Sequence, residues 1–135
     1  MERYNPSRAP NSKQWLALSE AERLELVSEY HADASEEIQA NDPGEALERN
    51  DLHTTMHVVV ENQLAEGLDP VCQAMSRLII EGLDRHDAVH AIGSELAGHL
   101  FDTLHGRTEA APDKPAQTYY ERLRKLTAAS WRNGQ

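Results

Sequence analysis

The residues of this sequence best suited to chemistry are two pairs of histidines with the same spacing. His53 and His57 form one pair, and His86 and His90 form the other. Side chains four residues apart leave a helix on the same side. In both pairs that side is also the apolar side of the expected helix. Two such pairs on facing helices could hold a transition-metal ion with four imidazole ligands.

Two further side chains could join these pairs. Glu61 lies one turn beyond His57, where it could act as a ligand or a general base. His31 shares the apolar face of an earlier expected helix. Imidazole and carboxylate without thiolate suit zinc, iron or manganese. The predicted metal ligands are therefore His53, His57, His86, His90, Glu61 and His31.

The histidines could also be ordinary core residues. A single inward-facing histidine is usually bonded to a backbone carbonyl and has no further role. Several together are harder to explain, because each buried ring without a partner costs about 1–3 kcal/mol. The whole domain is stable by only about 5–15 kcal/mol. We therefore interpret the histidines as a metal site in a bundle core. Such a site would suit a metal-dependent oxidoreductase or hydrolase. The alternative is a non-enzymatic interaction or regulatory module with a histidine-containing core.

The elements that must position these side chains are all helices. Periodicity and capping signals predict an all-α, single-domain bundle of about five helices. The expected helices cover residues 20–40, 51–66, 70–81, 85–105 and 115–131. Ser19 and Glu22 form a capping box at the first of them. Residues 1–18 are expected to be an extended arm, residues 19–131 the bundle and residues 132–135 a frayed end.

The expected helix over residues 85–105 has an apolar stripe that contains both of its paired histidines. The stripe is predicted to comprise His86, His90, Gly93, Ala97, Leu100, Phe101 and Leu104. Two other histidines, His99 and His105, are expected to lie off this stripe. They are therefore not among the predicted ligands.

Composition limits the classes of partner. The net charge of −10 over 135 residues argues against nucleic acid, because phosphate contacts need Lys and Arg. No apolar run approaches bilayer length and the N-terminus is polar, so we expect a cytoplasmic protein without membrane contact. The single Cys72 excludes an internal disulfide. The modest hydrophobic fraction of 39% leaves helix faces that a homo-oligomer could cover.

Two stretches of the sequence resemble a small bacterial family. They are Glu61–Ala65 and Gly82–Gly93, and the family is catalogued as domain of unknown function family 1841. The resemblance spans roughly residues 50–105. It implies no activity, so it leaves the function open.

The histidine spacing also partly resembles hemerythrin-like bundles, which bind two irons through histidines and carboxylates on four helices. The matching elements are His31, His57-xxx-Glu61 and His86-xxx-His90. The last expected helix, 115–131, has neither His nor Asp, so a complete di-iron set is not present. A weaker resemblance is to metal-dependent phosphohydrolases of the HD type. It would use His53 or His57, His86-Asp87 and Asp102.

Overall fold

The computed structural model describes residues 3–33, 43–104 and 115–133 of the chain. This part contains seven helices and no strand, which confirms the all-α prediction. The chain separates into two compact units, residues 1–66 and residues 67–135. Each unit has its own core, and the expectation of one bundle with about five helices is only approximate.

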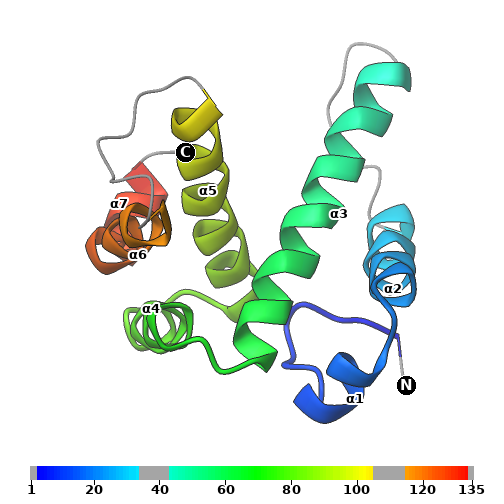
Figure 1. Ribbon diagram of the computed structural model, residues 1–135, viewed down its shortest axis with the longest axis horizontal. Coiled ribbons are helices and arrows are strands. Elements are labelled where there is room, and N and C mark those ends of the chain that lie inside the picture. The colour runs from blue at the N-terminus through cyan, green and yellow to red at the C-terminus, as the bar shows by residue number, and fades with distance from the viewer. Residues whose placement is uncertain (1–2, 34–42, 105–114, 134–135) are drawn as a thin grey trace. The chain divides into compact units, whose positions relative to one another are not determined.

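Three helices form the first unit. They are α1 (Ser12–Ala17), α2 (Glu20–Asp33) and α3 (Pro43–Ala65). Both α1 and α2 pack against α3, and the arm that precedes α1 lies on the same unit (Figure 1). The core of the unit is built from apolar and aromatic side chains of all these segments: Tyr4, Trp15, Val27 and Val58.

The N-terminal arm is docked by hydrogen bonds as well as by its apolar residues. Trp15 is fully buried, and its indole N–H donates to the Asn62 side-chain oxygen of α3 at 2.9 Å. The Arg23 guanidinium donates to that same oxygen at 3.0 Å. It also donates to the backbone carbonyls of Trp15, Leu16 and Leu18. Arg23 therefore satisfies carbonyls that the end of α1 leaves open.

The start of α2 follows the sequence prediction, whereas the start of α3 does not. Ser19 and Glu22 exchange hydrogen bonds of 2.9 and 3.1 Å, which confirms the capping box. The helix expected to begin at residue 51 begins eight residues earlier, at Pro43. Proline suits a first helical position because its missing N–H would have no partner there. The polar residues Asn50 and Asp51 are therefore inside α3 and do not start it.

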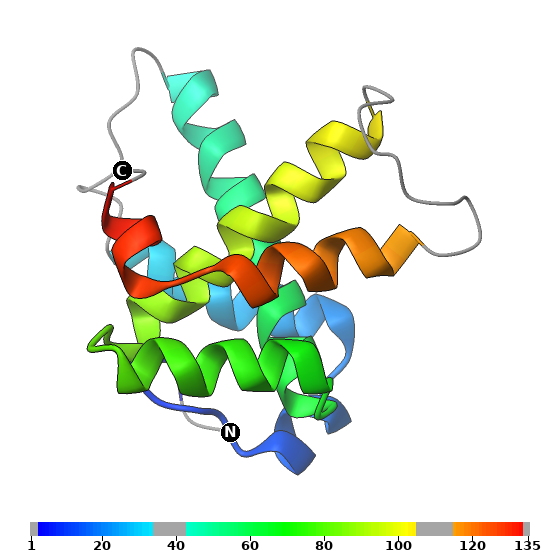
Figure 2. The same cartoon turned by 90° about the vertical axis from the view of Figure 1, so that its left-hand side faces the viewer.

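Four helices form the second unit. They are α4 (Asp69–Ile80), α5 (Arg85–Leu104), α6 (Pro115–Lys125) and α7 (Ala128–Asn133). Helices α4, α5 and α6 pack against one another, and α7 follows α6 after a bend (Figure 2). Their buried side chains are mainly aliphatic and include Val71, Leu78, Ile92, Leu96 and Leu123. In the described ranges of both units, no helix is long and apolar enough to cross a membrane.

The helix expected over residues 115–131 is broken in two. The hydroxyl and backbone groups of Thr127 and Ser130 bond to each other and cap a new helix, α7. The Glu81 carboxylate accepts from the Ala128 N–H at 2.8 Å. Arg77 donates to the carbonyls of Leu123 and Leu126, where α6 ends. These contacts satisfy the backbone groups that the break exposes, and the sequence pattern of the segment alone could not reveal them.

The buried face of α5 is displaced from the predicted stripe. Its buried residues include Ala88, Val89, Ile92, Leu96 and His99. Three predicted stripe residues near the end of the helix are instead exposed: Leu100, Phe101 and Leu104. His99 is only 8% exposed, so the prediction that it lies off the buried face is wrong. Because α5 packs against α4 and α6, its buried face is shifted by about one residue from the face that apolar periodicity favours.

Candidate metal-binding site

One face of α3 holds three of the predicted ligands. His53, His57 and Glu61 are each one turn apart, so helical geometry alone places them in a row. His57 and Glu61 are both 1% exposed, and His53 is half-buried. A buried carboxylate beside a buried imidazole needs hydrogen-bond partners, since a polar group buried without one is costly.

Tyr4 supplies these partners from the N-terminal arm. Its hydroxyl donates to Glu61 Oε2 at 2.6 Å. The same hydroxyl oxygen lies 3.1 Å from His57 Nδ1. The tyrosine ring is 4% exposed and packs edge-on against the His57 ring, with the centroids 6.0 Å apart. Tyr4 thus connects the carboxylate to the imidazole, and all three groups belong to the first unit.

The direction of these hydrogen bonds places a proton on His57 Nδ1. An ionised carboxylate can only accept, so the single Tyr4 proton points to Glu61. The Tyr4 oxygen must then accept from His57 Nδ1–H. A neutral His57 with its proton on Nδ1 has a lone pair on Nε2. This is the arrangement by which proteins commonly orient a metal-binding histidine, since the ring nitrogen that does not bind the metal donates to a neighbouring group.

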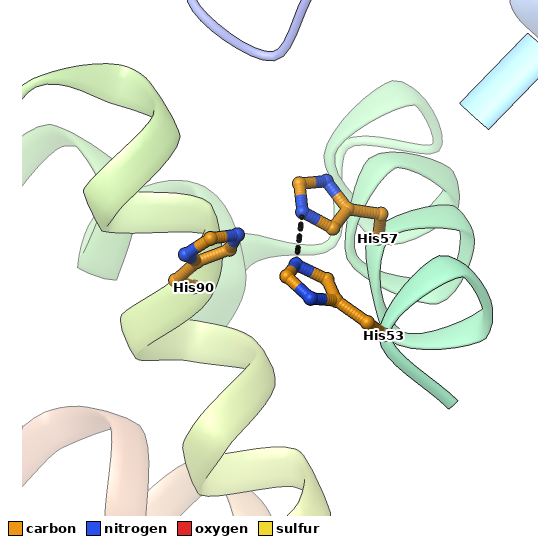
Figure 3. Close-up of side chains that lie close together, drawn as sticks. All are labelled: His53, His57 and His90. Carbon is orange, nitrogen blue, oxygen red and sulfur yellow. Dashed lines mark hydrogen bonds between the residues drawn. The ribbon is translucent and has the colours of Figure 1, made fainter. Parts of the chain in front are cut away.

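The Nε2 atom of His57 faces His53. The two Nε2 atoms are 3.1 Å apart, and the rings stack with an interplanar angle of 20° (Figure 3). Two imidazole nitrogens bound to one tetrahedral ion at about 2.0–2.1 Å would be separated by about 3.3 Å. The observed separation therefore fits two ligands of one ion. It equally fits a hydrogen bond from His53 Nε2–H to His57 Nε2.

The second histidine pair lies on α5, in the second unit. His86 and His90 are both half-buried. Their rings meet edge to face, with centroids 4.3 Å apart and an interplanar angle of 65°. The helix therefore places both rings on one side, as their spacing predicts.

The two other predicted ligands, Glu61 and His31, have different outcomes. Glu61 is buried beside His57, but its Oε2 accepts the Tyr4 hydroxyl. His31 lies in α2, and its side chain is outside the described residues. Sequence reasoning missed Tyr4, because nothing in an apparently extended arm indicates contact with a helix more than 50 residues away. The sequence offered one signal for a further donor, which was Glu61 one turn beyond His57, because a carboxylate that is buried there needs a hydrogen-bond donor.

Cys72, the single cysteine of the chain, is half-buried on α4 in the second unit. Burial raises the pKa of its thiol, and the nearby charge of Asp69 raises it further. In the metal-free protein both effects favour the protonated thiol. The donor atoms of the candidate site are imidazole nitrogens, with a carboxylate and a phenol behind them.

Comparison of the chain with models of known families, with curated proteins and with solved structures finds no match.

Proposed function

We propose that this protein binds a transition-metal ion through histidine side chains. The ligands that we propose are His53 and His57 of the first unit, whose geometry is given above, together with His90, which the sequence pattern adds as a third ligand. His86 is the proposed fourth ligand. The observation that carries the proposal is the His53–His57 pair, whose Nε2 atoms are 3.1 Å apart at the end of the Glu61–Tyr4–His57 chain.

The surroundings of His57 support a role as ligand. Its Nδ1 is occupied by the Tyr4 hydroxyl, so Nε2 is the nitrogen with a lone pair. Glu61 increases the basicity of this ring through Tyr4, as carboxylates behind metal-bound histidines do. When an ion binds, His53 has to move its proton from Nε2 to Nδ1. This change costs no net proton, so the pair can accept the ion near neutral pH.

Nitrogen ligands of this kind favour zinc, iron or manganese over magnesium or calcium. Three histidines would leave one coordination position for water, and a fourth histidine would close the site. An open site would support hydrolysis or redox chemistry. A closed site would make the ion structural or a stored cargo.

A second function is favoured by one specific observation. The chain His53–His57–Tyr4–Glu61 can be hydrogen-bonded from end to end without an ion. The protein would then be an interaction or regulatory module whose core contains histidines. Protonation of both rings would break the contact between His57 and His53, because two imidazolium groups have no lone pair to accept with.

Unfolding experiments with and without a chelator separate these two functions. A metal protein loses stability at neutral pH when the chelator is added, because binding stabilises only the folded state. A histidine core shows the same stability in both samples and loses it as the pH falls through about 6.5. Equal unfolding curves at neutral pH, together with no uptake of added Zn²⁺, would overturn the metal proposal.

Single substitutions then establish the ligand set. Competition with a coloured chelator measures the affinity for Zn²⁺ in His53→Ala, His86→Ala and His90→Ala. We expect His53→Ala and His90→Ala to lower it by more than about 100-fold, because each removes a ligand. An equal loss in His86→Ala would indicate a closed four-histidine site, and a small loss would indicate an open one. His90→Ala with wild-type affinity would remove His90 from the set.

A further inference from the structure

A second potential binding site lies in the first unit, between the N-terminal arm and α2. It is a pocket of about 960 Å³. Its walls come from arm residues between positions 3 and 14 and from Leu26 and Tyr30 of α2. This volume is in the range of pockets that hold small molecules. The pocket is distinct from the histidine pair, although Tyr4 contributes to both.

The charge of the lining is unusual for this protein. Arg3 and Arg8 both line the pocket, and the described residues that line it include no Asp or Glu. The chain as a whole carries a net charge of −10. A pocket with two guanidinium groups in so acidic a chain is therefore a local positive site. Guanidinium groups present paired N–H donors that match the two oxygens of a carboxylate or phosphate.

The rest of the lining suits an apolar body attached to that anion. The rings of Tyr4 and Tyr30 meet edge to face, with centroids 6.1 Å apart. Both line the pocket together with Leu26 and Pro10. The amide side chains of this part of the arm can donate or accept further hydrogen bonds. Apolar walls with a few polar groups are the usual composition of a small-molecule site.

We propose that this pocket binds a small organic anion, in which a carboxylate or phosphate is attached to an aromatic or aliphatic body. Arg3 and Arg8 bind the anionic group, and the tyrosine rings contact the body. The proposal does not depend on a bound metal, since neither His53 nor His57 is among the described residues that line the pocket. A ligand here would contact Tyr4, whose hydroxyl bonds to His57 and Glu61.

The fluorescence of Trp15 can report ligand binding in the pocket. Trp15 is fully buried, and its ring lies 5.9 Å from that of Tyr4. In a Trp131→Phe background, the fluorescence of Trp15 is followed in metal-free protein during titration with benzoate, phenyl phosphate and benzamidine. Benzamidine has the same ring but a positive charge. We expect saturable binding of benzoate or phenyl phosphate, whichever matches the natural anion better, and no binding of benzamidine.

Two substitutions test the arginines. Arg8→Gln and Arg3→Gln should each weaken anion binding by about tenfold, the loss typical of one charge-assisted hydrogen bond. Lys13→Gln is the matched control, because Lys13 lies at the start of α1, directly after the arm, and is not among the residues that line the pocket. It should leave binding unchanged. No saturable response to either anion, a response to benzamidine of equal strength, or equal losses in all three variants would overturn the proposal.

Discussion

The two histidine pairs have the same spacing but different surroundings. In the first unit, His57 is buried and its Nδ1 contacts the Tyr4 hydroxyl, which Glu61 holds in turn. In the second unit, His86 and His90 are half-buried and contact each other edge to face. Spacing alone places both rings of a pair on one side of a helix. The neighbours of a pair decide which ring nitrogen has the lone pair. In the first pair, Tyr4 and Glu61 make this nitrogen the Nε2 of His57, which orients His57 for the ligand role proposed above.

The largest effect that follows from this difference concerns His57. We expect His57→Ala to abolish metal binding, with an affinity for Zn²⁺ reduced more than about 100-fold, because it removes the best-oriented ligand. His86→Ala should have a smaller effect. Isothermal titration of both variants measures the difference. A larger loss of Zn²⁺ affinity in His86→Ala than in His57→Ala would show that the contacts of Tyr4 and Glu61 do not make His57 the stronger ligand.

Tyr4→Phe tests the contacts behind His57. The substitution leaves His57 Nδ1 and the Glu61 carboxylate buried without their shared partner. We expect the free energy of unfolding to fall by about 1–3 kcal/mol and the metal affinity to fall by about 10–100-fold. Denaturant unfolding and a metal titration provide the two values. Tyr120→Phe in the second unit is the control and should change neither. A Tyr4→Phe protein with wild-type affinity would show that this contact does not orient His57.

In each unit, one arginine donates hydrogen bonds to backbone carbonyls at the end of a short helix, and the two arginines can be compared. Arg23 donates to three carbonyls around the end of α1 and to Asn62, and Arg77 donates to the carbonyls of Leu123 and Leu126. We expect Arg23→Met and Arg77→Met each to cost about 1–3 kcal/mol in unfolding free energy. Only Arg23→Met should also weaken metal binding, because it loosens the arm that carries Tyr4. Equal metal affinities in the two variants would contradict this link.

The smallest expected effect concerns the helix caps. A backbone hydrogen bond from Ser19 lowers the pKa of Glu22, and the Ser19 side chain lowers it further. Ionised Glu22 therefore stabilises the first unit at pH values above its ordinary pKa of 4.5, and this contribution is lost as the pH falls through the lowered value. In the second unit, the hydrogen bonds between Thr127 and Ser130 involve no titrating side chain. Unfolding curves of Glu22→Gln should therefore differ from wild type at neutral pH and approach it in strong acid. Those of Ser130→Ala should differ from wild type both at neutral pH and in strong acid. A Glu22→Gln difference that persists in strong acid would contradict the assignment.

The sequence predicted local features well and long-range contacts poorly. The capping box at Ser19 and the helix over residues 85–105 depend on neighbouring residues, and both are close to the structure. The break before α7 depends on Arg77 and Glu81, which are more than 40 residues away. Tyr4 was missed for the same reason. The row formed by His53, His57 and Glu61 follows from helical spacing, but the bond from Tyr4 to Glu61 arises only when the arm folds back.

Metal analysis of the purified protein tests the central proposal most directly. The chain is purified without a histidine tag or added metal, and its metal content is measured beside that of a His53→Ala/His57→Ala variant. We predict near-stoichiometric zinc, iron or manganese in the wild type and its loss in the variant, with both proteins folded by circular dichroism. Absence of metal from the wild type, with no uptake on reconstitution, or equal metal in both proteins, would contradict the proposal.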